Sequence, residues 1–338
     1  MLPEKRKHPK IKSKLHPRSK HRERYDFEKL VEKCPELEEY VYYNKFKDLS
    51  IDFFDPDSVK TLNKSLLKFY YGIEYWDIFP NYLCPPVPGR ADYIHYIADL
   101  LGSSNNGTIP KGRRVQCLDI GVGANCIYPM VGYKEYGWSF IGCDIDATAI
   151  KSAKNIIKAN PVLKGKIECR WQSDPNDIFY GVLDRSERID VSICNPPFHS
   201  SSEEVRAGTI RKLRSLSKKS HNEPILNFGG QQRELWCEGG EKRFIKDMIF
   251  QSSHFSKSCL WFTTLVSKES NLETFHKALK KVKALEVRII PMGQGNKKSR
   301  ILAWTFLKEE QHAKWMARKW DKDFKDSEWK YEPKPKKP

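Results

Sequence analysis

The chain has 338 residues, of which 39% are hydrophobic and 12% aromatic, and this composition supports a buried core and excludes wholesale disorder. The apolar runs are shorter than the ~20 residues of a membrane span, and no apolar segment of a signal peptide follows the basic N-terminus. The net charge of +17 is concentrated in residues 1–24 (+8), 206–219 (+6) and 333–338 (+3). This distribution favours nucleic acid as partner over a membrane surface, because the basic segments lack an amphipathic apolar face.

The first third of the chain is expected to be mainly helical. Residues 1–24 are too polar to order themselves, so we expect a basic, disordered arm. Asp55 followed by a proline predicts a helix N-cap, whereas the proline-rich stretch 81–89 predicts irregular structure. The predicted helices cover residues 25–34, 36–43, 57–71 and 91–101. Together they predict an N-terminal, RNA-binding helical module over 25–107.

From residue 108 onward, short apolar strands alternate with helices. Strands are expected at 115–120, 139–145, 167–171, 189–194, 259–266, 285–291 and 301–307. Helices are expected at 147–159, 242–251 and 272–282. About ten residues without a helical pattern join the last two strands, which predicts an antiparallel hairpin. The fold class is therefore α/β: a Rossmann-like class I methyltransferase sheet over 108–310 with a final antiparallel strand, followed by a C-terminal helix and basic tail over 311–338.

The first predicted strand ends in the sequence D-I-G-V-G, which places Asp119, Gly121 and Gly123 at its carboxyl end. Ligands bind beyond the carboxyl ends of strands in open α/β sheets, and glycine lets the backbone approach them closely. Asp144 ends the next strand and can accept hydrogen bonds from both hydroxyls of a ribose. A G-x-G turn by itself can also be a plain tight turn, and the dinucleotide fingerprint G-x-G-x-x-G is not met. With Asp144 in this place, the pattern favours a nucleoside cofactor such as S-adenosyl-L-methionine.

The strongest catalytic signal is Asn195-Pro196-Pro197-Phe198, directly after the buried strand 189–194. Two consecutive prolines remove two N–H donors and restrict the backbone, which leaves carbonyl acceptors without competitors. The Asn195 side chain adds an acceptor, so the corner can hold both hydrogens of a planar amino group. Phe198 can lie against the flat face of a base. The alternative is a strand-terminating turn with a core aromatic residue.

These motifs resemble a known family. The stretch 119–129, the strand ending at Asp144 and the N-P-P-F corner are similar to the bacterial 23S ribosomal RNA adenine-N6 methyltransferases, which are related to the eukaryotic enzyme that methylates U6 small nuclear RNA. The segments 84–101, 227–241 and 300–306 also look like segments of this family, so that the resemblance spans about 16–307. N-P-P-F alone also occurs in methyltransferases that act on guanine N2, DNA adenine and protein glutamine.

The resemblance implies roles for further residues. Arg90 would pair with the methionine carboxylate of the cofactor, and Gly121 and Asn125 would line the amino-acid end. Asp144 would bind the ribose, and Gln172 to Asp174, after the third strand, would lie near the adenine. The family tolerates the small polar residue at position 125 where many methyltransferases have a third glycine.

The implied reaction is the S-adenosyl-L-methionine-dependent methylation of an adenine N6 in 23S ribosomal RNA, either free or in a large-subunit assembly particle, in the cytoplasm. Neither a metal nor a membrane is required, and the nine scattered cysteines include no C-x-x-C pair of a zinc site. The expected phosphate-binding residues are Arg18, Lys20, Arg22, Arg24, Arg206, Arg211, Lys212 and Arg214. The alternatives are methylation of a guanine N2 or a protein glutamine, and a non-catalytic RNA-binding factor of ribosome assembly.

Overall fold

The computed structural model describes residues 11–201, 232–294 and 297–320. Its helices are α1 Phe27–Lys33, α2 Pro56–Tyr71, α3 Val87–Ser103, α4 Ile127–Tyr136, α5 Ala147–Ala159, α7 Gln232–Leu235, α8 Gly240–Ser252, α9 Leu272–Lys281 and α10 Glu309–Lys319. Its strands are β1 Tyr42–Tyr43, β2 Leu49–Ser50, β3 Gln116–Ile120, β4 Ser139–Asp144, β5 Ile167–Trp171, β6 Ile189–Cys194, β7 Cys259–Val266, β8 Glu286–Gln294 and β9 Lys297–Thr305. Short 3-10 helices are η1 Pro35–Tyr40, η2 Pro161–Leu163, η3 Ser253–Phe255 and η4 Glu269–Asn271.

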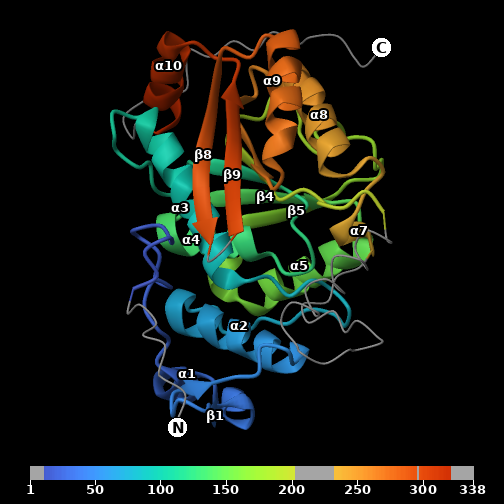
Figure 1. Ribbon diagram of the computed structural model, residues 1–338. Helices are drawn as coiled ribbons and strands as arrows, with labels where there is room; N and C mark the ends of the chain where they lie inside the picture. Colours follow the sequence, from blue (N-terminus) through green and yellow to red (C-terminus); the bar gives the residue numbers. More distant parts are fainter. Residues whose placement is uncertain (1–10, 202–231, 295–296, 321–338) are drawn as a thin grey trace.

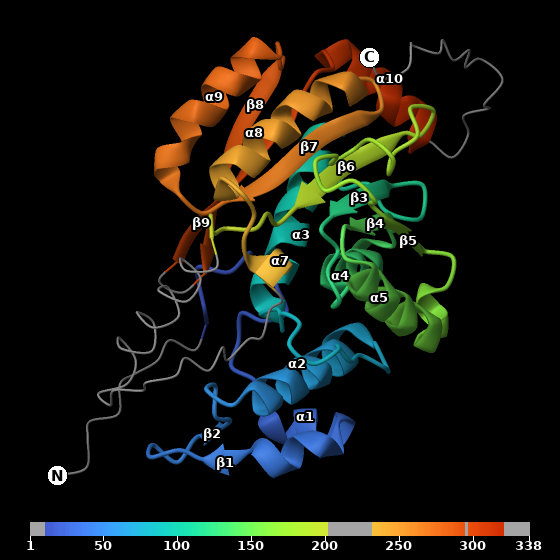
Figure 2. The ribbon, with the colours of Figure 1, turned by 90° about the vertical axis from the view of Figure 1, so that its right-hand side faces the viewer.

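The described strands form a seven-stranded sheet in the order β5-β4-β3-β6-β7-β9-β8, in which β9 is antiparallel to both of its neighbours. This confirms the predicted fold class and the final antiparallel strand. The helices α3, α4 and α5 pack on one face and α8 and α9 on the other, each over its own apolar cluster (Figures 1 and 2). Because β3, β4, β5 and β6 are parallel, their carboxyl ends meet at one edge of the sheet.

Several predicted elements are confirmed with small shifts in their bounds. Asp55 caps α2 by accepting from the backbone N–H groups of its first turn. By contrast, β8 and β9 are longer than predicted, because backbone pairing continues past the apolar residues as far as Gln294 and Lys297. The helix predicted over 36–43 is wrong: η1 ends at Tyr40, and the next residues pair with β2 in a small hairpin. The aromatic pair Tyr42-Tyr43 favours this extended backbone over a helix.

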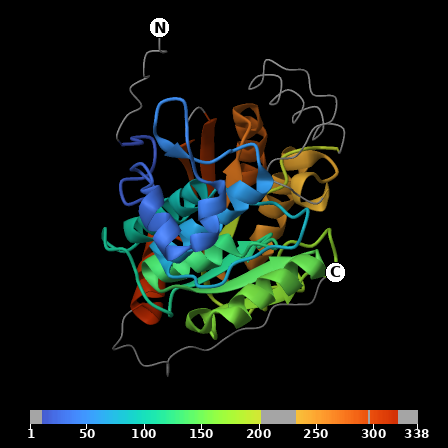
Figure 3. The ribbon, with the colours of Figure 1, turned by 90° about the horizontal axis from the view of Figure 1, so that it is seen from below.

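The predicted boundary at residue 107 also differs from the structure. The helix α3 is longer than expected and begins inside the proline-rich stretch, because Pro88 in the first turn needs no N–H partner. It packs against α4 and β6 rather than only against the N-terminal helices. In Figure 3, which views the molecule from below, α1 and α2 (blue) lie in front of this layer. The N-terminal helical part therefore ends before α3, and α3 belongs to the layer that covers the sheet.

The expectation of a disordered arm over 1–24 is wrong for its described part, residues 11–24. Leu15, His16 and His21 are at most 5% exposed. The guanidinium of Arg18 donates to Asp99, to the Tyr136 hydroxyl and to a backbone carbonyl of α3, at 2.7–3.0 Å. A count of charges does not reveal this packing, because the segment is held mainly by polar side chains that form hydrogen bonds with residues of α2, α3 and α4.

Candidate active site

The glycine loop after β3 is folded against the end of β4. The backbone N–H groups of Gly121 and Val122 both donate to the Cys143 carbonyl, at 2.9 Å. Gly121 and Gly123 have positive φ angles of 76° and 63°, a conformation that side chains other than glycine rarely adopt. A Cβ at Gly121 would meet nothing within 4 Å in the described structure. The loop thus leaves room for a ligand to approach its backbone.

The carboxylate of Asp144 is oriented by this loop. Its Oδ2 accepts from the Gly123 N–H at 3.0 Å, and its Oδ1 accepts from the Asp146 N–H at 2.9 Å. Burial raises the pKa of Asp144, and the two backbone bonds oppose that rise. Each oxygen keeps lone-pair capacity for one more donor, which fits the two hydroxyls of a ribose.

Asp119 lies fully buried in β3, next to the glycine loop. Neither of its carboxylate oxygens has a hydrogen-bond partner among the described residues. Burial raises its pKa well above the usual range, the charge of Asp144 adds to this rise, and the charge of Arg90 opposes it. A buried carboxylate without an internal donor is the expected counterpart of a ligand that carries N–H groups or positive charge.

Arg90 stands in the first turns of α3 and reaches α4. Its Nη1 donates to the Tyr128 hydroxyl at 2.7 Å, and its charge acts on Asp119. Asn125 has a structural role: its Oδ1 accepts from the Ile127 N–H at the start of α4. The structure therefore places Arg90, Asn125 and the glycine loop around the carboxyl end of β3.

Gln172 is the site residue whose side chain departs most from the expectation. It follows β5, and its backbone N–H donates to the Asp144 carbonyl at 2.9 Å, so that it is close to the site. Its side-chain amide, however, donates to the Tyr180 carbonyl at 2.7 Å and accepts from the Asp174 N–H at 3.1 Å. Gln172 is also 5% exposed. Both ends of the amide shape the loop, so the structure gives this side chain a supporting role.

The Asn-Pro-Pro-Phe corner follows β6 directly. Oδ1 of Asn195 is buried and has no hydrogen-bond partner within the described ranges. Pro196 and Pro197 carry no N–H that could occupy it. His199, two residues after Pro197, donates its backbone N–H to the Leu235 carbonyl at 3.1 Å. This hydrogen bond links the corner to α7. The corner thus presents a free acceptor at the edge of the sheet that also carries the glycine loop.

Two tyrosines of this site were missed by sequence reasoning. Tyr128 holds Arg90, and Tyr93 lies fully buried behind the corner, with its hydroxyl 2.9 Å from the Thr263 Oγ1. The sequence does contain a signal for Tyr93: it stands three residues after Arg90, and this spacing places both residues on one side of a helix. A tyrosine hydroxyl in a core also needs a polar partner, which marks such residues for attention.

The predicted phosphate-binding residues are engaged within the protein where the structure describes them. These are Arg18, Lys20, Arg22 and Arg24. Lys20 pairs with Glu135 at 2.9 Å and Arg24 with Asp48 at 3.6 Å, and their side chains are 40% and 49% exposed. Arg18 is instead committed to anchoring its segment. The remaining four, Arg206, Arg211, Lys212 and Arg214, lie outside the described residues.

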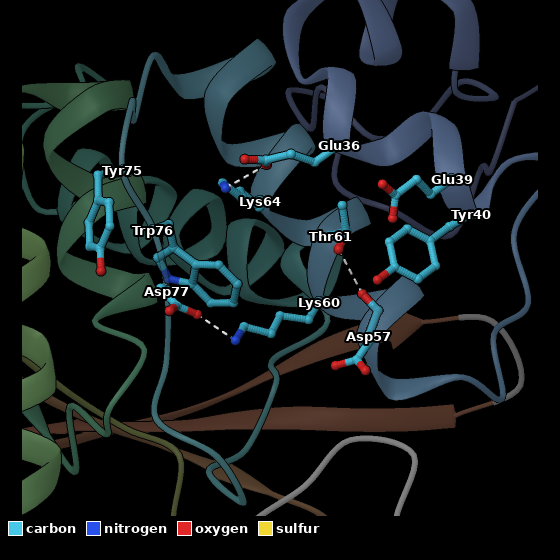
Figure 4. A pocket seen from close by; sticks show the side chains of 10 residues that line it. All are labelled: Glu36, Glu39, Tyr40, Asp57, Lys60, Thr61, Lys64, Tyr75, Trp76 and Asp77. Atoms are coloured by element: carbon cyan, nitrogen blue, oxygen red, sulfur yellow. Dashed lines mark hydrogen bonds and ion pairs between the residues drawn. The ribbon is translucent and has the colours of Figure 1, made fainter.

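A cavity of about 350 Å³ lies between the N-terminal helices and the chain that follows them (Figure 4). Two ion pairs cross it, Lys60–Asp77 at 2.5 Å and Lys64–Glu36 at 2.6 Å. None of the residues that line it belongs to the predicted site. It touches the site indirectly, because the Trp76 indole in its wall donates to the Asn125 carbonyl.

The sheet order, the glycine loop with Asp144, and the acceptor corner after β6 together define a class I methyltransferase. A family model described as RNA methyltransferase matches residues 9–308, and the chain belongs to this family. None of the helices in the described ranges combines the length and apolar character needed to cross a membrane. In the same ranges, no three His, Cys, Asp or Glu side chains gather in a way that could hold a metal ion.

Similar proteins agree with this assignment. A protein of Cytophaga hutchinsonii named ribosomal RNA large subunit methyltransferase F is 56% identical over 94% of this chain and 98% of its own length. A protein of the same name from Photobacterium profundum is 51% identical over 95% and 99%. The crystal structure of the human METTL16 catalytic domain in complex with a MAT2A 3'UTR hairpin has a TM-score of 0.73 at 27% identity, over 87% of this chain and 96% of that chain. The METTL16 N-terminal domain in complex with SAH has a TM-score of 0.68 at 25% identity, over 87% and 99%.

Proposed function

We propose that this protein transfers a methyl group from S-adenosylmethionine to N6 of an adenine in 23S ribosomal RNA. The observation that carries the proposal is the Asn195 Oδ1, a buried acceptor without a partner among the described residues, at the carboxyl end of β6. The names of the similar bacterial proteins support a ribosomal RNA of the large subunit as substrate. A cytoplasmic location follows from that substrate, since bacterial ribosomal RNA is made and assembled there.

The corner would hold the amino group of the base. The two N–H groups donate to the Asn195 Oδ1 and to the Pro196 carbonyl, which draws the nitrogen lone pair out of conjugation with the ring and directs it outward. Phe198, which is partly exposed, stacks on the base. An adenine inside a helix has to be extruded to reach this corner.

The residues around β3 fit the cofactor on three observations. Asp144 keeps capacity for two ribose hydroxyls, the backbone at Gly121 faces open space, and Asp119 lacks an internal donor among the described residues. In the proposal Asp119 receives the ammonium group of the methionine part, and Arg90 its carboxylate. When bound, S-adenosylmethionine supplies a methyl group that is already activated, so the protein mainly positions the acceptor amine and excludes water.

A first experiment tests the role of the corner. Asn195→Ala should lower methyl transfer to 23S ribosomal RNA by roughly 10²–10³, because one aimed acceptor is lost, while the Kd for S-adenosylmethionine stays close to wild type. Asn105→Ala, in the surface loop beyond α3, is the matched control. Methyl transfer within a few-fold of wild type in Asn195→Ala would remove the corner from the reaction.

A second experiment decides the acceptor. Nucleoside analysis of 23S ribosomal RNA from a strain that lacks the gene should reveal one missing N6-methyladenosine, and the purified protein should restore it. A missing N2-methylguanosine, or label found in protein glutamine, would favour the alternatives with the same chemistry. Binding of the RNA without any transfer would favour the non-catalytic assembly factor.

A further inference from the structure

The hydroxyl of Tyr93 lies directly behind the acceptor corner. Tyr93 is fully buried in α3, and its hydroxyl is 2.9 Å from the Thr263 Oγ1 of β7. The backbone N–H of Cys194, the last residue of β6, approaches the same hydroxyl at 3.4 Å. Asn195 follows immediately, so this contact lies one residue from the acceptor.

The donors and acceptors among Tyr93, Thr263 and Cys194 can be assigned by counting the hydrogens that each group carries. Thr263 has one hydroxyl hydrogen, which it donates to the Ser192 carbonyl at 2.8 Å. The Tyr93 hydroxyl has two acceptors within reach, the Thr263 Oγ1 at 2.9 Å and the Cys194 carbonyl at 3.5 Å. Because the Thr263 hydrogen is used and the Cys194 carbonyl is farther away, Tyr93 is the donor in its bond with Thr263. The lone pairs of the Tyr93 oxygen then remain to accept from the Cys194 N–H. The arrangement links α3, β7 and the final residues of β6 in a fixed order of donors and acceptors.

The same helix connects this cluster to the cofactor end of the site. Arg90 and Tyr93 are three residues apart on α3, and the ring of Tyr93 meets that of Tyr128 edge-on, with centroids 5.4 Å apart. Tyr128 in turn accepts from Arg90 at 2.7 Å. A displacement of α3 would therefore move the acceptor corner and Arg90 together.

We propose that Tyr93, supported by Thr263, is a positioning residue that holds the end of β6 so that the Asn195 Oδ1 meets the substrate amine. This inference rests on the proposed function, because it assigns Asn195 to the amine. The contribution is specific to the transfer step, since displacements of about 1 Å at a reacting group already reduce rates strongly. Tyr93 itself touches neither base nor cofactor in this account.

The test is the kinetics of Tyr93→Phe, which keeps the ring and removes the hydroxyl. Single-turnover methyl transfer to in vitro transcribed 23S ribosomal RNA, or to large-subunit particles where transcripts are not methylated, should slow about tenfold. The Kd for S-adenosylmethionine should stay unchanged, because Arg90 and Tyr128 are retained. Thr263→Val should reproduce the slow transfer, and Thr263→Ser, which restores the hydroxyl, should recover it.

Controls separate positioning from stability. Thr305→Val removes a buried threonine hydroxyl of β9, remote from the corner, and should lower the melting temperature without slowing transfer. Wild-type transfer in folded Tyr93→Phe, or equal transfer by the Val and Ser variants of Thr263, would overturn the inference. If Asn195→Ala is also active, the proposed function fails; if Asn195→Ala is inactive and Tyr93→Phe is not slowed, the positioning role alone fails.

Discussion

Acidification from pH 7 to pH 5 should destabilise the packing of residues 11–24 through two buried imidazoles. Burial lowers the pKa of His21 and of His95 to about 3, and nearby positive charges add to the effect. His21 bonds the Tyr71 hydroxyl at 2.9 Å, and His95 bonds the Tyr136 hydroxyl at 2.7 Å. Both rings are neutral in the folded protein, so an unfolded chain binds more protons between pH 6.5 and pH 3.

The sign and size follow from linkage. A histidine with a lowered folded pKa contributes stability above its ordinary pKa of about 6.5, and this stability is lost as the pH falls below that value. At pH 5 the loss is about 2 kcal/mol for each of the two imidazoles. Asp92 acts in the opposite direction, because burial raises its pKa to about 6 and its protonation relieves a cost. The protonation of Asp92 offsets about 1 kcal/mol of the loss from the two imidazoles. The net loss in the free energy of unfolding is then about 3 kcal/mol.

Urea denaturation at the two pH values measures this loss, and hydrogen exchange of residues 11–24 locates it. The variant His21→Gln should reduce the difference between pH 7 and pH 5 by about 2 kcal/mol, since it removes one of the buried rings whose pKa is lowered. A stability that is equal at both pH values, or higher at pH 5, would refute the reasoning. So would a His21→Gln variant with the wild-type pH dependence.

Three further outcomes are expected. Asp144→Ala should weaken S-adenosylmethionine binding by about 2–3 kcal/mol in calorimetry, and an unchanged Kd would mean that the ribose lies elsewhere. Asp190→Ala should lower the free energy of unfolding by about 3–5 kcal/mol in urea denaturation. The buried carboxylate pairs with Lys319 at 2.8 Å and accepts from the Trp315 indole at 2.8 Å, so that it anchors α10. A loss below 1 kcal/mol would contradict this anchoring. Deletion of residues 1–10, which carry four basic side chains, should flatten the plot of log RNA affinity against log salt by up to about 3, and superimposable plots would exclude phosphate contacts there.

Much of the catalytic domain could be predicted from local patterns. The strands β5, β6 and β7 have the predicted bounds, and the alternation of strands and helices was sufficient for the fold class. The glycine loop and the acceptor corner were also found, because strand ends are visible in the sequence and each motif has its own backbone requirement. The direction of the last hairpin followed from the shortness of its connection.

The N-terminal part shows where local patterns fail. The apolar content of residues 11–24 is low and the charge is high, so the local pattern predicts disorder. Its order depends on partners such as Asp99 and Tyr136, more than 80 positions away in the sequence. Charge predicts affinity for a polyanion, but it does not reveal which basic side chains are already occupied within the protein.

For the site, the sequence by itself determined which residue types stand at which strand ends: the glycine loop, Asp144 after β4 and Asn195 after β6. Only the tertiary structure decided what surrounds them. In the structure the Gln172 amide forms hydrogen bonds within its own loop. The Asp119 carboxylate and the Asn195 Oδ1 have no partners among the described residues. Tyr93 contacts Thr263, which is 170 positions away in the sequence. The physical reason is that a backbone conformation is set by neighbours in sequence, whereas burial and hydrogen-bond partners are set by neighbours in space.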